Sequence, residues 1–167
     1  GKNNNYGSRD GVGENARFDR PYHIHEYTNG SIIIADRNAW TISQAESNGT
    51  VTKLLGNPYS YGDGSGDASE ININTDGLGG LEVDMSNGDI YYSDYSRIYM
   101  FDVSENTVTK IHDSGGERIG GLGFLNGELY FTHQFRMTVN KLTYDGSSYS
   151  MSNVVGQDGS GQWRDEN

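Results

Sequence analysis

The side chains best placed for chemistry in this sequence are two histidines that flank one isoleucine in segment 22–27. His23 and His25 are two positions apart, so in an extended strand both point to the same side, toward a central channel if the strand is an inner one. Two imidazoles on one face can ligate a metal ion or transfer protons. The same pattern also suits a polar strand face that contacts water or a neighbouring sheet. The remaining histidines, His112 and His133, have no partner at ligand spacing in the sequence.

An acidic, glycine-bearing segment is the second candidate site. It reads Asp63-Gly-Ser-Gly-Asp67-Ala-Ser-Glu70, and calcium binds carboxylate and carbonyl oxygens on a flexible backbone. The spacing differs from that of an EF-hand loop, because Gly66 directly precedes Asp67 and no second acidic residue follows two positions later. Asp63, Asp67 and Glu70 are therefore candidate calcium ligands, and the alternative is a loop that only connects two structural units.

Two Asn-Gly dipeptides fit the acceptor pattern for N-glycosylation. They begin at Asn29 and Asn48 and are followed by Ser31 and Thr50. Asn-Gly is also the strongest short hairpin signal, since both central residues of a type I′ turn need a positive φ. Asn29 and Asn48 are thus expected at exposed hairpin tips, which carry glycan in a secreted eukaryotic protein and are plain turns in a bacterial cytoplasm.

The elements that must position these residues are short antiparallel strands that recur three times. The central copy, 87–102, contains an Asn-Gly turn, the aromatic run 90–92, a second turn and a returning strand. Related copies begin at Asn29 and Asn126. One strand precedes each copy and another follows it, so each unit holds four strands, which is typical of propeller blades.

The sequence thus predicts an all-β fold of about three four-stranded antiparallel blades in one domain. No segment has a convincing helical period. The predicted blades cover 22–56, 79–112 and 119–155, with a lead-in over 1–21 and a tail over 156–167.

The units resemble the blades of six-bladed β-propellers of the NHL-repeat type, with some likeness to the YWTD type. An NHL blade commonly opens with Asp-Gly-x-Gly, Phe and Pro before its first strand. The first unit follows this pattern from Asp10 through Pro21 onward. The third unit lacks the lead and has His133 where the other two have Asp36 and Asp94.

The number of blades implies that other blades complete the fold. Closed propellers have about four to eight blades, and an apolar sheet face must be covered. Asp-Gly-x-Gly motifs begin at Asp10, Asp63 and Asp158, so the tail is expected to open a further blade. The chain is therefore expected to pair with a second copy, to stack into an array, or to belong to a longer polypeptide.

Enzymes that share this resemblance supply the rival hypothesis. Amidating lyases similar to this repeat family bind metal through a His directly after the blade-opening Pro, but Tyr22 holds that place here. Lactonase-type propellers hold a cation with Glu, Asn and Asp from several blades. Glu26, Glu82 and Asp84 lie on predicted inner strands and are candidates for such a set, and the alternative is that they are solvated or hydrogen-bonded strand carboxylates.

Composition excludes several classes. The formal net charge is −11, which disfavours binding to nucleic acid or to anionic lipid. The longest apolar run, 32–35, is too short to span a bilayer, so no membrane insertion is expected. The absence of cysteine removes disulfides, zinc–thiolate sites and thiol catalysis.

We expect a non-enzymatic extracellular or cell-surface module that binds protein or carbohydrate or has a structural role, assembled with copies of itself or with further blades. The alternative is a cation-dependent propeller enzyme of the lactonase or lyase class. Aromatic strand residues suit either stacking on sugars or packing between blades, and they are Tyr91, Tyr92, Tyr99, Tyr130 and Phe131.

Overall fold

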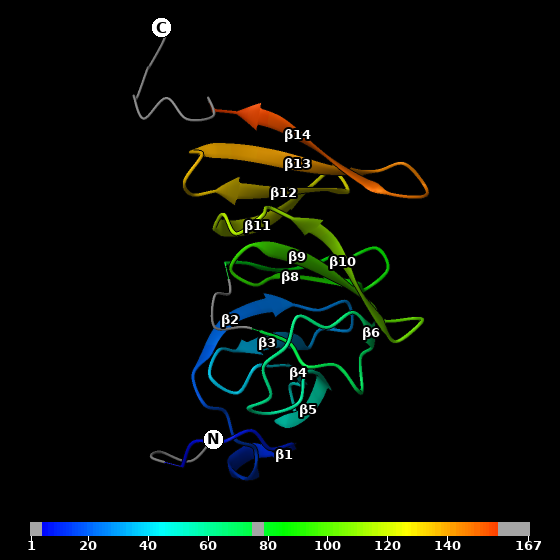
Figure 1. Ribbon diagram of the computed structural model, residues 1–167. Coiled ribbons are helices and arrows are strands. Elements are labelled where there is room, and N and C mark those ends of the chain that lie inside the picture. Colours follow the sequence, from blue (N-terminus) through cyan, green and yellow to red (C-terminus); the bar gives the residue numbers. More distant parts are fainter. Residues whose placement is uncertain (1–4, 75–78, 157–167) are drawn as a thin grey trace, which may run out of the picture.

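The computed structural model describes residues 5–74 and 79–156 and is all-β (Figure 1). Three antiparallel sheets follow one another along the chain and stack in that order, which confirms the predicted blades. Apart from a three-residue 3-10 helix, η1 (Gly13–Asn15), every regular element in these ranges is a strand. No helix in the same ranges is long and apolar enough to cross a membrane.

Each blade is an up-and-down meander in which the first long strand is innermost. Blade 1 comprises β1 (Gly11–Val12), β2 (Pro21–Glu26), β3 (Ile32–Asp36), β4 (Thr41–Ala45) and β5 (Thr50–Leu55). Blade 2 comprises β6 (Gly66–Asp67), β7 (Leu81–Val83), β8 (Ile90–Ser93), β9 (Arg97–Asp102) and β10 (Thr107–Asp113). Blade 3 comprises β11 (Ile119–Leu125), β12 (Glu128–His133), β13 (Thr138–Tyr144) and β14 (Tyr149–Val155).

The Asn-Gly turns join the first two long strands of each blade, but only one has the expected type I′ backbone. The glycines have φ of 78°, 87° and 78° in blades 1, 2 and 3. Asn126 also has a positive φ, of 53°. The side-chain oxygens of Asn29 and Asn87 instead accept the backbone N–H two positions later, at 3.0 Å in both turns. A short asparagine side chain can thus close the turn without the left-handed conformation.

Blades 1 and 2 carry a fifth strand that the sequence pattern did not predict. β1 pairs with β5, and β6 pairs with β10, so the segment before each blade covers its outer edge. Asp10 accepts the N–H of Lys53 at 2.9 Å, and Ser65 accepts the N–H of Lys110 at 3.1 Å. Ser65 therefore holds the place of Asp10. The repeated Asp-Gly-x-Gly motif would align Asp63 with Asp10, and that alignment is wrong by two residues.

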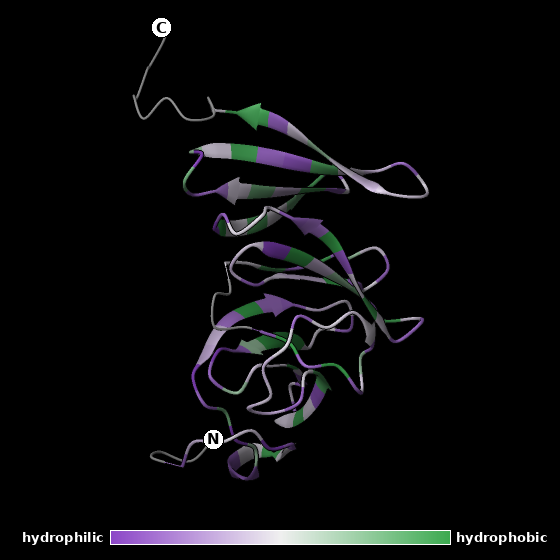
Figure 2. Cartoon of the chain, in the orientation of Figure 1, coloured by the Kyte–Doolittle hydropathy of each residue, from purple (hydrophilic) through white to green (hydrophobic). Residues whose placement is uncertain are grey.

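Two hydrophobic cores lie between the blades. In the first, Ile33 of β3 faces Ile90 and Tyr92 of β8, and in the second, Tyr91 of β8 faces Phe131 of β12. Successive side chains of β8 thus point to opposite faces and pack against blade 1 and blade 3 in turn. Figure 2 shows hydrophobic stretches along the strands. Each fully buried apolar side chain stabilises the fold by roughly 1.5–3 kcal/mol. Most of the aromatic residues considered for sugar stacking therefore pack between blades.

The inner strands of blades 2 and 3 approach closely at a glycine. Gly80 donates its N–H to the hydroxyl of Ser93 at 3.0 Å, at the start of β7. A Cβ on Gly80 would lie 2.4 Å from the backbone nitrogen of Leu122 in β11 and 2.8 Å from its Cβ. Only glycine fits this blade-to-blade contact.

Candidate binding surface

All three blades place the same kind of turn at one end of the stack. Because the blades are antiparallel meanders, β3, β8 and β12 finish at the same end, and the turns 37–40, 94–96 and 134–137 follow them there. We call this the arginine end, and its arginines are Arg20, Arg37, Arg97, Arg118 and Arg136. The turns at the opposite end contain no Lys or Arg and carry carboxylates at Glu46, Asp84, Asp89, Glu105 and Asp145.

A buried polar residue lies at the end of the second long strand of every blade, and in blades 1 and 2 it orders the turn that follows. Asp36 accepts the N–H of Asp19 at 2.6 Å and that of Ala39 at 3.3 Å. Burial raises the pKa of Asp36, and these two N–H donors oppose the rise. Asp94 and His133 hold the equivalent positions and are equally buried. The shared residues noted in the sequence are thus part of the scaffold of the arginine end.

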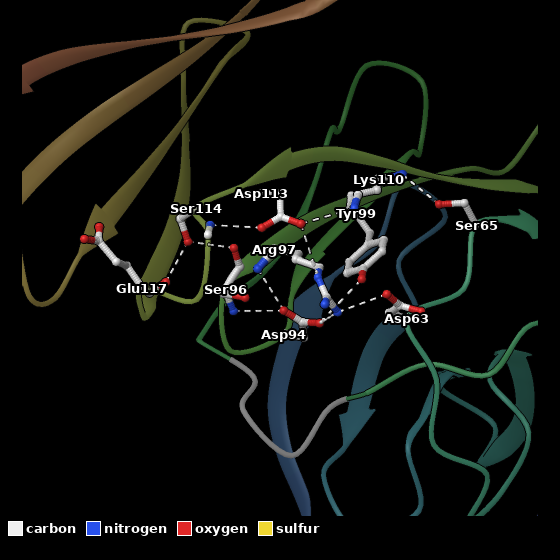
Figure 3. Close-up of polar contacts among 11 residues, drawn as sticks. Asp63, Ser65, Asp94, Ser96, Arg97, Tyr99, Lys110, Asp113, Ser114 and Glu117 are labelled. Carbon is white, nitrogen blue, oxygen red and sulfur yellow. Dashed lines mark hydrogen bonds and ion pairs between the residues drawn. The ribbon is translucent and has the colours of Figure 1, made fainter.

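Arg97 ties three segments together at this end (Figure 3). Its Nη1 lies 3.3 Å from a carboxylate oxygen of Asp94 and 3.3 Å from one of Asp63. Its Nε lies 3.4 Å from Asp113, which also contacts Nζ of Lys110 at 3.2 Å. One guanidinium therefore links the segment before blade 2, the β8–β9 turn and the end of β10.

The three candidate calcium ligands are not brought together. Asp63 faces Arg97, whereas Asp67 lies on β6 toward the opposite end. The hydroxyl and N–H of Ser69 bind the Asp67 carboxylate and lower its pKa. In the described ranges, no three His, Cys, Asp or Glu side chains are grouped so that they could hold a metal ion. Calcium at Asp63, Asp67 and Glu70 stays a prediction, and it requires Asp63 and Asp67 to leave their present partners.

His23 and His25 lie on β2, the innermost strand of blade 1, and are half-buried. They pair with Ala35 and Ile33, so both belong to the face that packs toward blade 2. Nε2 of His25 lies 3.1 Å from a carboxylate oxygen of Glu82 on β7. Burial raises the pKa of Glu82, and the neighbouring His25 opposes that rise. A histidine–carboxylate pair thus connects the inner strands of two blades.

The other two carboxylates proposed for a cation site do not join this pair. Glu26 is exposed at the end of β2. Asp84 is in the turn after β7, where its Oδ1 accepts the N–H of Ser86 at 2.9 Å. The lactonase-like set of Glu26, Glu82 and Asp84 remains without a common centre among the described residues.

The fold brings the other two histidines to one aromatic ring. The ring centroids of His112 and Phe131 are 5.0 Å apart, and those of Phe131 and His133 are 6.0 Å apart. Burial lowers the pKa of His112, and His133 adds to this effect. The two imidazoles come from β10 and β12, so no local sequence spacing could have indicated their proximity.

Both candidate glycosylation sites are exposed. Asn29 is in the β2–β3 turn and Asn48 is in the β4–β5 turn, at the end opposite the arginines. The Asn48 side chain accepts the N–H of Thr50 at 2.8 Å and donates to Glu46 at 3.1 Å. Attachment of glycan stays a prediction.

A small polar pocket on blade 3 was missed in the sequence. It has a volume of about 90 Å³. Thr138 and Asn140 share the buried face of β13 with Leu142, so a hydroxyl and an amide at alternate positions of a predicted buried face were its only signal. Six side chains line the pocket: His133, Arg136, Thr138, Asn140, Met151 and Asn153.

Each blade also presents an exposed aromatic residue near the arginine end. The Arg37 guanidinium lies 5.6 Å from the ring centroid of Tyr22, and that of Arg118 lies 5.9 Å from Tyr95. Phe135 is the most exposed of the three, at 66%. Aromatic and arginine side chains are enriched where proteins bind partners.

Comparison with known proteins supports the fold and no closer relationship. No protein-family model matches the sequence, and the curated proteins contain no match. Similar solved structures include auxiliary nutrient binding proteins from Bacteroides thetaiotaomicron and Bacteroides ovatus. Both are 16% identical to this chain, with TM-scores of 0.61 and 0.63 over 89% and 87% of it.

A third similar structure is the virginiamycin B lyase from Staphylococcus aureus, with 16% identity and a TM-score of 0.57 over 83% of this chain. The chain spans 35%, 34% and 42% of the lengths of these three structures. At such identities the likeness shows a propeller-type fold alone. The similar structures include both binding proteins and an enzyme.

Proposed function

We propose that this chain is a non-catalytic binding or structural module, extracellular or at the cell surface, whose three blades form part of a longer stack. A second copy of the chain or further blades of a longer chain supply the rest. One observation carries the proposal: the outer face of blade 1 exposes apolar side chains at positions that are buried between blades elsewhere in the molecule.

Two pairs of equivalent residues show this difference. Ile24 and Ile32, on the first two long strands of blade 1, are 69% and 39% exposed. Leu81 and Ile90 hold the same places in blade 2, where they pack against blade 1 and are 5% and 0% exposed. Exposed apolar surface of this kind marks an interaction site. A preceding blade would bury Ile24 and Ile32 in the same way.

The outer face of blade 3 provides a matching contact. Gly121 donates its N–H to Thr132 Oγ1 at 3.0 Å, as Gly80 does to Ser93 Oγ. A Cβ on Gly80 would collide with blade 3, but a Cβ on Gly121 would meet nothing within 4 Å. Gly121 is therefore placed to receive the inner strand of a following blade, as Gly80 receives β11.

The test is the native mass of the 18.4 kDa chain across a concentration series, by light scattering after size exclusion. We expect reversible self-association, which both Ile24→Asp and Gly121→Val abolish while leaving the circular dichroism spectrum unchanged. Tyr144→Ser changes an exposed aromatic outside both faces and should leave association intact. A chain that stays monomeric at high concentration contradicts assembly with a second copy, and association that survives both substitutions contradicts the use of these two faces.

The alternative, a cation-dependent enzyme, is favoured by one observation, the His25–Glu82 pair on the inner strands. Calorimetric titration with Ca²⁺, Mn²⁺ and Zn²⁺ separates the two proposals. Stoichiometric binding that is lost in both His25→Asn and Glu82→Gln would favour the enzyme. Binding that is unchanged in these variants would remove its structural support.

A further inference from the structure

We propose that the pocket on blade 3 binds a neutral saccharide, whose hydroxyl-bearing edge enters the pocket while its ring lies against Phe135. This inference goes beyond the proposed function, because stacking concerns the outer faces of blades 1 and 3. The pocket lies on the opposite face of blade 3, which packs toward blade 2: Asn140 pairs with Phe131 of the second core.

The polar groups of the pocket are built into the sheet. Thr138 and Asn140 are 4% and 3% exposed, and the Asn140 amide donates to Thr138 Oγ1 at 3.0 Å. Asn153 pairs with Asn140 across β13 and β14, which places a second amide beside the first. Amides and hydroxyls each offer both donors and acceptors, and sugar hydroxyls require both. An apolar ligand would remove water from these groups without replacing its hydrogen bonds, which is costly, so the pocket favours a polar ligand.

Charge favours a neutral ligand over an anion. Arg136 is the cation of the pocket, and its Nε contacts the Glu117 carboxylate. The same carboxylate oxygen lies 3.2 Å from Nδ1 of His133. The Arg136 guanidinium therefore already faces an internal counter-ion, and an anionic ligand would have to displace Glu117. A neutral polyhydroxyl ligand bonds to the amides without that exchange.

Size and shape indicate a sugar edge with an aromatic platform. A volume of about 90 Å³ is well below that of pockets enclosing drug-sized molecules. Phe135, 66% exposed, directly precedes the lining residue Arg136 in the β12–β13 turn. An exposed ring of this kind offers an apolar face at little conformational cost. The pocket then holds two or three hydroxyls while the ring stacks outside.

The experiment is an amide chemical-shift titration of the whole chain with methyl glycosides of glucose, galactose and mannose. We expect at least one glycoside to bind and to shift the amides of 133–140 and 151–153. Asn153→Ala and Phe135→Ala, both at exposed positions, should each weaken binding about fivefold to tenfold, as expected for loss of one hydrogen bond or stacking contact. Tyr144→Ala, an exposed aromatic at the opposite end, should bind as the wild type does.

Three outcomes overturn the inference: no glycoside shifts these amides, both variants bind like the wild type, or galacturonate or inorganic phosphate binds more tightly than the neutral sugars. Asn140→Ala offers a stronger test where its thermal unfolding shows that it folds. Ile24→Asp and Gly121→Val disrupt the proposed stacking but leave the pocket intact. Sugar binding by these variants therefore distinguishes failure of this inference from failure of the proposed function.

Discussion

At the scale of single residues, an aspartate accepts backbone N–H groups of the following turn at both ends of the blades, but its contribution to stability differs between the two ends. Asp94 accepts the N–H groups of Ser96 and Arg97 at 2.9 and 2.8 Å. Asp145 accepts two N–H groups in the β13–β14 turn, each at 2.8 Å. Asp94 is buried and Asp145 is exposed. Water can replace a lost partner only at the exposed site.

Asp94→Ala should therefore lower the free energy of unfolding by about 1–3 kcal/mol, since it leaves buried N–H groups unsatisfied. Asp145→Ala is the matched control and should change it by less than about 0.5 kcal/mol, as is usual at exposed sites. Urea unfolding of both variants checks the difference. Equal losses would show that burial does not determine the contribution of these turns.

Glu82 makes stability depend on pH. Burial raises the pKa of this carboxyl in the folded protein, so folding disfavours its charged form. Glu82 does not affect the free energy of unfolding while its carboxyl is protonated in both the folded and the unfolded state. It lowers that free energy as the pH rises above the pKa of the carboxyl in the unfolded chain, about 4.3. Glu82→Gln should match the wild type near pH 3.5 and exceed its stability at pH 7. Unfolding at the two pH values measures this, and a constant difference would contradict it.

The sequence indicated some of these residues but not their partners. Alternation along one strand placed His23 and His25 on a common face. The approach of His25 to Glu82 depends on how two blades pack, and no local pattern records that geometry. The same holds for Asp63 and Asp113 beside Arg97, which come from other segments of the chain, whereas Asp94 is only three residues from Arg97.

At the scale of elements, the strands that were predicted are those with an alternating pattern. The long strands of each blade carry several alternating apolar residues, which is a strong signal. β1 and β6 contain two residues each and have no such period, so only their pairing in the folded chain identifies them. The Asp-Gly-x-Gly motif misled the alignment for this reason: Gly66, rather than Gly64, pairs with the outer strand.

The glycine at the start of β7 should be intolerant of any side chain. Gly80→Ala places a methyl 2.4 Å from the Leu122 backbone nitrogen, and we expect a loss of about 1–3 kcal/mol from overpacking. Gly121→Ala changes the equivalent residue of blade 3, which has open space, and should be nearly neutral in the monomer. Thermal unfolding at low protein concentration compares them. If Gly80→Ala is as stable as Gly121→Ala, the blades are not held at this contact.

At the scale of the whole molecule, each core belongs to two blades and none to a single blade. The fold class was predictable because three related units in one chain each contain an antiparallel meander, and such sheets must cover one another. Which residues face which neighbour could not be assigned in advance. Tyr91 and Tyr92 are adjacent in sequence, yet they belong to the second and the first core, respectively.

Protection from hydrogen exchange should differ across the stack. β9 lies between β8 and β10, and both cores contain residues of this strand. β14 has only β13 as a neighbour in the described ranges, and six of its seven residues are exposed. We expect the amides of β9 to exchange most slowly and those of β14 most rapidly. Comparable protection in the two strands would show that the blades open as one unit.

The positions of β1 and β6 have a consequence for synthesis of the chain. Each leaves the ribosome before any other strand of its blade, yet pairs with the last one. An unpaired strand edge is a template for pairing with other chains, and nascent chains are vulnerable to such pairing while incomplete. In blades 1 and 2 the partner strand, β1 or β6, has therefore already been synthesised when β5 or β10 emerges. Each of these blades thus shields its own edge from neighbouring chains at the moment it is completed.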